Sequence, residues 1–324
     1  MRVVVTGSIA YDYLMLFDGE FTEHLLEEQL KSLSVSFLVE SMRRERGGTA
    51  ANIAYTLGLL KGSPYVMATA GQDFGGYREW LERHGVQTHP IVIVEDEYCA
   101  SFFVNTDDTH NQIGFFYAGA MAYAGQLRFA EQVPDAQMAI ISPNEPAAMR
   151  AHVQECKALA LPYIYDPSQQ TIRLSAEDLY AGINGARLLT VNEYELGMIR
   201  EKTGLSEDQI RQMTGGLLVT RGKDGSEIFV DGTCYEIPAV PPRQVAEPTG
   251  AGDAFRAGLL RGMQLGLPWE VAGRMGALAA AYVLEHVGTQ NHTFTVEEFV
   301  ARYRQHFDDE GALDMLLIAN RELV

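Results

Sequence analysis

Short runs of apolar residues alternate with longer amphipathic stretches along most of this chain. The run Val3-Val4-Val5 reads as a buried strand that ends in a turn at Gly7-Ser8. Aromatic and β-branched content predicts further early strands at residues 34–39, 91–94, 99–104 and 113–117. Later strand-like runs, separated by helical stretches, fall at residues 138–142, 163–165, 187–191, 217–220 and 227–230. This βα alternation predicts a parallel sheet covered by helices on both faces.

The early strands interrupt the βα alternation. The segment 49–60 between them is predicted to be helical, as is the late apolar segment 276–284. A polar turn at residues 105–111 joins two of the early strands into a hairpin. We therefore expect an α/β fold with a small β-sheet lid over the carboxyl edge of the large sheet, where ligands bind in open α/β folds. The expected large α/β domain takes residues 1–12, 41–90 and 118–324, and the lid takes residues 13–40 and 91–117.

Composition narrows the class of protein. The chain has 324 residues, of which 47% are hydrophobic and 21% charged, enough for a large core. Its formal net charge of −18 argues against a nucleic-acid partner or an anionic membrane. Three cysteines far apart in the sequence predict no disulfide framework and fit a reducing cytoplasm. The apolar run at the start is too short for a signal-peptide core, and no run reaches transmembrane length, so we expect a cytoplasmic protein.

The most informative motif is residues 247–258, Glu-Pro-Thr-Gly-Ala-Gly-Asp-Ala-Phe-Arg-Ala-Gly. Small residues at Gly250, Ala251 and Gly252 let backbone N–H groups close around an anion at the start of a helix. Asp253 beside such an anion site could accept a proton from an attacking hydroxyl, which suits phosphoryl transfer. The alternative is a plain turn with an acidic residue in the first turn of a helix.

A second set of residues could bind a diol. Asp12 follows the first strand and its turn at Ser8, and Asn52 lies near the start of the next helix. A carboxylate accepts from two hydroxyls, and an amide both donates and accepts. Gly48 in the preceding glycine pair lets the backbone approach a ligand. A surface-turn Asp and a solvent-facing Asn are the alternative.

Two later loops also follow strands. Asn192 and Glu195 are three residues apart, so they either form a helix-capping box or reach a phosphate-bound metal ion through water. Thr220, Gly222 and Gly225 form either a plain hairpin turn or a phosphate-binding loop.

Together these motifs resemble the ribokinase (PfkB) family of carbohydrate and nucleoside kinases, over most of the chain. The resemblance implies a ribokinase-like fold and ATP-dependent phosphoryl transfer with Asp253 as general base and Gly250–Gly252 as the anion hole. It implies nucleotide binding by Asn192, Glu195, Thr220, Gly222, Gly225, Thr249 and Gly288. Magnesium would be held through water near Asn192 and Glu195, with no direct protein ligand. The family usually has Asp where this chain has Glu247, close to the place of a possible potassium ion.

The acceptor is suggested by aromatic residues of the expected lid, since aromatic faces stack on nucleobases. Motif spacing and the segment Asp166-Pro-Ser-Gln-Gln170 are similar to the bacterial adenosine kinase branch of the family. That similarity implies that Phe102 and Phe116 sandwich a purine, and that Ser36, Gln169, Gln170 and Arg173 contact the nucleoside. Each Phe could instead belong to the core of the lid or to a homodimer interface. A sugar kinase of the ribokinase or fructokinase type, an inosine or guanosine kinase, and a non-catalytic nucleoside-binding regulator remain as alternatives.

Overall fold

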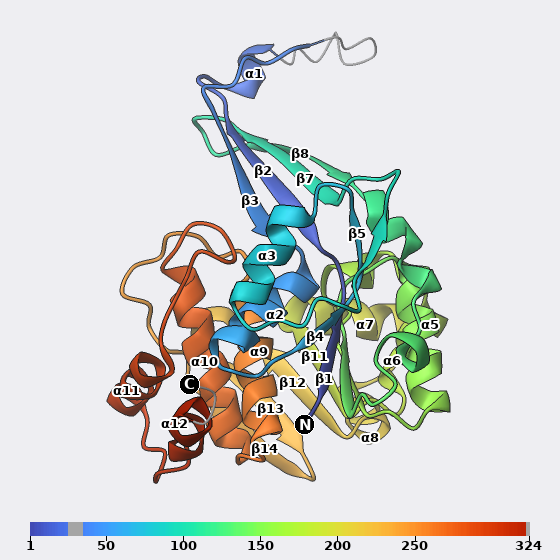
Figure 1. The fold of residues 1–324 in the computed structure, drawn as a ribbon, viewed down its shortest axis with the longest axis vertical. Helices are drawn as coiled ribbons and strands as arrows, with labels where there is room; N and C mark the ends of the chain where they lie inside the picture. The colour runs from blue at the N-terminus through green and yellow to red at the C-terminus, as the bar shows by residue number, and fades with distance from the viewer. Residues whose placement is uncertain (25–34, 322–324) are drawn as a thin grey trace.

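The computed structural model describes residues 1–24 and 35–321 and contains a large central sheet (Figure 1). The order of its eight strands is β14-β13-β12-β11-β10-β9-β1-β4. Their bounds are β1 Val3–Thr6, β4 Tyr65–Met67, β9 Met138–Ile141, β10 Tyr163–Tyr165, β11 Leu188–Asn192, β12 Gly216–Thr220, β13 Ser226–Val230 and β14 Thr233–Ile237. The six neighbouring strands β4, β1, β9, β10, β11 and β12 pair in parallel. Strands β13 and β14 extend the sheet at the β12 edge as an antiparallel hairpin.

Successive side chains of each buried strand point to opposite faces of this sheet, and they form two hydrophobic cores, one on each face. Val3 and Val5 point into one core with the helices α2 Thr49–Leu59, α9 Ala251–Gln264 and α10 Trp269–Leu284. Val4 points into the other with α5 Pro146–Ala158, α6 Ala176–Ile183 and α7 Glu193–Thr203. The two groups of helices lie on opposite sides of the sheet in Figure 1, which confirms the expected α/β arrangement.

A smaller, four-stranded sheet of order β3-β2-β7-β8 stands beyond the carboxyl ends of the large sheet (Figure 1). Its strands are β2 Ala10–Leu16, β3 Ser41–Gly47, β7 Ala100–Thr106 and β8 Gln112–Tyr117. Because β2 follows β1 after a three-residue turn, the first segment of the chain links the two sheets directly.

The remaining elements are two short strands and several helices outside the two sheets. Strands β5 Thr69–Gly71 and β6 Val92–Val94 pair in parallel. The other helices are α1 Phe21–His24, α3 Gly75–Arg83, α4 Phe129–Gln132, α8 Glu207–Met213, α11 Val296–His306 and α12 Asp314–Arg321, with single-turn or 3-10 segments at Gly119–Gln126, Ser168–Ile172 and Gly222–Asp224. Across residues 1–24 and 35–321, no helix has both the length and the apolar character that crossing a membrane requires.

The structure differs from the sequence prediction in the early segment. Residue 34 lies outside the described residues, and residues 35–39 form no strand, so the strand predicted at 34–39 is wrong in its described part. Phe37 instead packs edge-on against Phe17 and Phe21, with ring centroids 5.0 and 5.2 Å away. The antiparallel partner of β2 is β3, Ser41–Gly47, which the expected division assigns to the large domain. The division into two domains stays a prediction, with this strand on the side of the small sheet.

Candidate active site

The sequence motifs converge on a cavity of about 750 Å³ at the carboxyl edge of the large sheet, beneath the small sheet. Residues from both sheets line it: Ser8, Asp12, Gly48, Asn52, Phe102, Phe116, Gln169, Asn192, Glu195, Thr220, Gly222, Thr249, Gly250, Gly252, Asp253, Arg256 and Thr289 among them. We call this the acceptor cavity.

A second cavity of about 600 Å³ adjoins the first and is mainly apolar. It is lined by Gly225, Ala251 and Phe255 together with Pro241, Val245 and Leu284, and we call it the donor cavity. Both cavities share Thr220, Gly222 and Gly252 in their walls. Two ligands, one in each cavity, would therefore meet at the beginning of α9.

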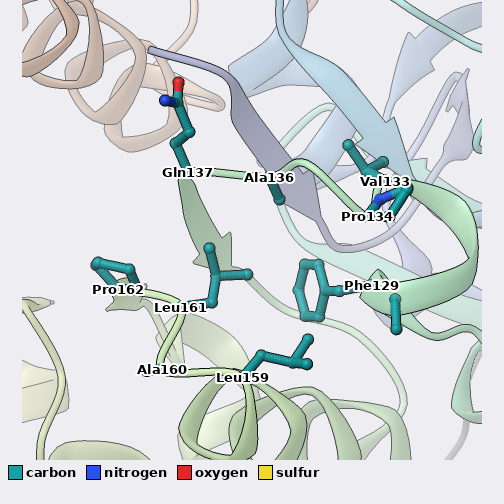
Figure 2. A pocket seen from close by; sticks show the side chains of 10 residues that line it. Phe129, Val133, Pro134, Ala136, Gln137, Leu159, Ala160, Leu161 and Pro162 are labelled. Atoms are coloured by element: carbon teal, nitrogen blue, oxygen red, sulfur yellow. The ribbon is translucent and has the colours of Figure 1, made fainter.

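A different cavity, of about 420 Å³, lies at the amino ends of β9 and β10 (Figure 2). Phe129, Leu159 and Leu161 point into it, and no acidic or basic side chain is among its lining residues. Since phosphoryl transfer needs charged groups, we place the candidate active site at the opposite edge of the sheet.

The beginning of α9 has the geometry of an anion site. Gly250 has φ 83°, in the left-handed region, and a Cβ there would lie 2.8 Å from Cγ2 of Thr289. Glycine is therefore required on both conformational and steric grounds. The first backbone N–H groups of a helix have no partner within the helix, and two residues at this helix start, Gly250 and Gly252, line the acceptor cavity.

Asp253 lies in the first turn of α9, and its carboxylate is held by Asn52 of α2. Asn52 Nδ2 donates to Asp253 Oδ2 over 2.9 Å. Asn52 Oδ1 accepts from Thr289 Oγ1 at 2.7 Å and from Gln290 Nε2 at 3.0 Å, so the orientation of the amide is fixed. Burial raises the pKa of Asp253, while Arg256 and the Asn52 hydrogen bond oppose that rise. A carboxylate with a raised pKa is better suited to accept a proton near neutral pH.

Asp12 on β2 faces the same cavity from the small sheet. Burial, together with the negative charges of Glu247 and Glu45, raises its pKa to about 6. A Cβ at Gly47 would collide with the Asp12 carboxylate, so that glycine makes room for it. With Asn52 occupied by Asp253 and Thr289, Asp12 is the more available of the two predicted diol-binding groups.

Asn192 and Glu195 form a capping box, one of the two arrangements that the sequence left open. Asn192 Oδ1 accepts from the Glu195 N–H at 2.8 Å, and Glu195 Oε2 accepts from the Asn192 N–H at 2.9 Å. Both residues also line the acceptor cavity, and the capping box uses only one of the two Glu195 carboxylate oxygens. The arrangement fits a divalent ion held through water, because an oxygen ligand remains free to bind a coordinated water. Among the described residues, no cluster of three or more acidic, His or Cys side chains could hold a metal directly.

The turn between β12 and β13 is a hairpin, as one of the two interpretations predicted. Gly222 and Gly225 adopt positive φ values of 56° and 89° within it. Thr220 at the end of β12 and Gly222 reach both cavities. The hairpin and the phosphate-loop interpretations are thus compatible.

Phe102 on β7 and Phe116 on β8 are directly opposite in the strand register. Opposite residues of paired strands project to the same face, and both rings line the acceptor cavity. They are 37% and 55% exposed, so neither is part of a hydrophobic core. Their neighbours project to the other face, where Phe103 stacks on Tyr13 with centroids 4.6 Å apart.

Four predicted site residues do not line either cavity. Arg173 forms an ion pair with Glu145, at 3.6 Å, and Gln170 is buried beneath its own turn. The Gly288 N–H donates to Glu247 Oε2 at 2.9 Å, which ties this loop to the start of the signature motif. Ser36 is exposed and belongs to the segment that forms no strand.

One charged residue that lines the acceptor cavity, Arg256, is not among the site residues expected from the sequence. Arg256 could have been found, because it is three positions after Asp253 and shares a face of the helix with it. Thr289 was expected only as part of a segment, residues 287–289, near the adenine. In the structure it lines the acceptor cavity and donates to Asn52 Oδ1, a contact between positions 237 residues apart that no local pattern contains.

Comparison with known proteins agrees with this geometry. A nucleoside kinase of Methanothermobacter thermautotrophicus is 31% identical over 305 residues, covering 93% of this chain and 95% of the relative. A nucleoside kinase of Burkholderia thailandensis, solved in complex with inosine, superimposes with a TM-score of 0.84 at 37% identity, covering 94% of this chain and 98% of that one. A nucleoside kinase of Methanocaldococcus jannaschii, described as an archaeal member of the ribokinase family, gives a TM-score of 0.85 at 27% identity, covering 94% and 99%.

The family model of the pfkB family of carbohydrate kinases matches residues 3–295, which include every strand of both sheets and the whole signature motif. This family implies the use of ATP, typically with a divalent metal ion. The chain belongs to the pfkB carbohydrate kinase family and has its ribokinase-like fold.

Proposed function

We propose that this protein is an ATP-dependent nucleoside kinase that phosphorylates the 5′-hydroxyl of a purine nucleoside. The observation that carries the proposal is the junction of the two cavities at Gly252, beside Asp253. A nucleotide in the donor cavity would present its terminal phosphoryl group at the N-terminus of α9. A nucleoside in the acceptor cavity would present its hydroxyl to Asp253.

The contents of the acceptor cavity favour a nucleoside over a free sugar. Phe102 and Phe116 offer two aromatic rings to a base, and a simple sugar has no need of them. Asp12 is opposite Phe102 in the strand register and is near enough to Asp253 for the two charges to interact, which favours it as the acceptor of hydrogen bonds from the ribose hydroxyls. Gln169, from the turn after β10, adds an amide for the base or the ribose. The names of the relatives in Methanothermobacter and Burkholderia support the same class of acceptor.

Within this class we propose adenosine as the acceptor, with inosine as the second candidate. The adenosine proposal rests on the aromatic lid and on motif spacing similar to bacterial adenosine kinases. Inosine is favoured by one observation, namely that the Burkholderia relative was solved with inosine bound.

The chemistry follows from the placement of the groups. Asp253 accepts the proton of the 5′-hydroxyl while the oxygen attacks the terminal phosphorus of ATP. The new O–P bond forms as the bond to the ADP oxygen breaks, and the N–H groups at Gly250–Gly252 stabilise charge on the transferred group. A magnesium ion held through water near Asn192 and Glu195 would neutralise the triphosphate. A potassium ion near Glu247, a cytoplasmic location and a homodimer stay predictions.

The test is a panel of acceptors assayed with ATP and magnesium, scored by ADP release and by the identity of the product. Adenosine, inosine, guanosine, cytidine, ribose and fructose cover the alternatives. We expect adenosine or inosine to have the highest kcat/KM, with a nucleoside 5′-monophosphate as product. Higher kcat/KM for a free sugar would overturn the proposed acceptor class, and nucleoside binding with no ADP release would indicate a regulator.

A further inference from the structure

Arg256 occupies a position on α9 one turn after Asp253, and its guanidinium is held at two of its three nitrogens. Nη2 donates to Asp166 Oδ1 at 2.6 Å, and Nε donates to Thr190 Oγ1 at 3.3 Å. Asp166 follows β10 and is fully buried, so this contact fixes the far end of the arginine in the protein interior. Two bonds of this kind hold the planar group in one orientation.

The third nitrogen, Nη1, points toward the anion site. A Cβ built on Gly252 would lie 2.7 Å from Arg256 Nη1, so the guanidinium lies directly against the backbone of the glycine turn. Within residues 1–24 and 35–321 the structure gives hydrogen bonds for Nε and Nη2 of Arg256 and none for Nη1. Nη1 therefore has N–H donors available at the place where the two cavities meet.

The charge balance of the acceptor cavity makes this donor significant. Asp12, Glu195 and Asp253 line the cavity with carboxylates, and a triphosphate would add further negative charge. Among the described residues lining that cavity, Arg256 is the one with a cationic side chain. A buried, oriented cation beside a transferring phosphoryl group stabilises the charge that spreads over its oxygens.

We propose that Arg256 is a catalytic residue that donates through Nη1 to the phosphoryl group during its transfer, with Asp166 as the residue that positions it. As the hydroxyl oxygen bonds to phosphorus and the ADP oxygen departs, the proton moves to Asp253 and Arg256 keeps its own protons. The proposal rests on the proposed kinase reaction at the same site. It assigns to this chain a stabilising arginine supplied from its own signature helix.

The test must separate direct contact from two indirect roles. Arg256 could act by holding Asp166 in place. It could also act by lowering the pKa of Asp253, since its charge opposes the rise that burial causes there. Acidic and polar groups that act on Asp253 from other elements are Glu195, Asn52, Asp12 and Asp166. The first three remain in every Arg256 variant, and Asp166 remains in the single substitution. An effect through the pKa of Asp253 moves the acid limb of the pH profile and vanishes at high pH. A direct contact lowers kcat at every pH.

The main variant is the double substitution Arg256→Met with Asp166→Asn, which removes the cation without leaving a buried carboxylate unpaired. We expect kcat to fall about 10²–10³-fold at pH 9, with KM for ATP and nucleoside within a few-fold. Affinity for ADP with aluminium fluoride and nucleoside, a mimic of the transition state, should fall by a similar factor. The matched control is Arg261→Met, a buried arginine further along the same helix, which should leave kcat unchanged.

A second variant, Arg256→Lys, keeps the charge and is expected to lose at least tenfold in kcat, since an ammonium cannot contact Asp166 and the phosphoryl group together. It carries the test should the double variant fail to fold. Wild-type kcat at pH 9 in either variant would overturn the proposal, as would unchanged affinity for the transition-state mimic. If the wild-type protein phosphorylates an acceptor other than a nucleoside, the proposed function is wrong. The role of Arg256 is then tested by the same variants with that acceptor.

Discussion

At the scale of single residues, the candidate site brings several buried carboxylates close together. Asp12, Asp166 and Asp253 all have raised pKa values, with burial as the largest cause in each. One cation, Arg256, contacts Asp166 and opposes the rise at Asp253. Such a cluster is costly to the folded protein and is typical of functional sites rather than of cores.

The raised pKa of Asp12, about 6, predicts an effect on stability that depends on pH. Since the pKa of Asp12 in the folded state lies above the ordinary aspartate value of 3.8, this group favours the folded state below pH ~4, and that contribution is lost as pH rises through ~6. Asp12→Asn should therefore raise the free energy of unfolding relative to wild type at pH 8 more than at pH 4, by at most about 3 kcal/mol. Urea unfolding at the two pH values measures this difference.

The same substitution should impair function. Loss of the carboxylate that accepts from the ribose diol should raise the nucleoside KM strongly at pH 8, and 2′,3′-dideoxyadenosine should be a poor acceptor for wild type. In wild type, kcat/KM for the nucleoside should decline as pH falls through about 6. A variant that is neither more stable at pH 8 nor weaker in nucleoside binding would contradict the assigned role of Asp12.

At the scale of elements, the β7–β8 pair separates binding from packing by strand register. Phe102 and Phe116 project into the acceptor cavity, and Phe103 projects to the other face onto Tyr13. Phe102→Ala and Phe116→Ala should each raise the adenosine KM by the loss of roughly 1–3 kcal/mol of stacking, with little change in the ATP KM. Phe103→Ala is the matched control on the same strand, and it should lower Tm and leave KM unchanged. If Phe102→Ala lowers Tm and leaves the adenosine KM unchanged, the ring of Phe102 supports the packing of the small sheet and does not bind the base.

Most elements could be predicted from sequence because their residues report local burial. The parallel strands are mainly apolar, and α2 and α10 have long buried faces. The strand Ser41–Gly47 could not be found, because its sequence Ser-Met-Arg-Arg-Glu-Arg-Gly is polar and mostly exposed. Residues 35–39 have the apolar and aromatic content of a strand, yet their one aromatic residue, Phe37, packs on Phe17 instead.

Local motifs led to residues that line the acceptor cavity, whereas contacts between distant positions could not be predicted from the sequence. Asp253, Gly250 and Thr220 belong to local patterns, and all three reach the acceptor cavity. The hydrogen bond from Asn52 to Asp253 joins residues 201 positions apart, and no local pattern contains it. Arg173 was expected at the ligand, but the nearby Glu145, on a different segment, pairs with it instead.

At the scale of the whole molecule, α9 connects the hydrophobic core to the site. Its N-terminus carries Asp253, and its middle packs closely on α10, where a Cβ at Gly258 would lie 2.5 Å from the Met275 carbonyl oxygen. Gly258→Ala should therefore displace α9, costing about 1–3 kcal/mol in stability. Because small displacements of catalytic groups are costly, kcat should also fall.

The control for this prediction is Gly197→Ala on α7, where an added Cβ would meet no atom within 4 Å. It should raise stability by up to ~1 kcal/mol and leave kcat unchanged, since alanine favours the helix. Thermal unfolding and kcat on the same preparations compare the two variants. Equal Tm changes would show that the α9–α10 contact has room that the structure does not indicate.

The most direct test of phosphoryl transfer to a nucleoside with Asp253 as the base compares wild type and Asp253→Asn in one assay. Each is given ATP labelled in the terminal phosphoryl group, magnesium and adenosine or inosine, and the labelled product is identified. We expect wild type to form the labelled nucleoside 5′-monophosphate. Asp253→Asn should form it about 10²–10⁴-fold more slowly, with a nucleoside affinity that changes only a few-fold. Wild-type turnover by Asp253→Asn, or no labelled nucleoside from wild type, would contradict this mechanism.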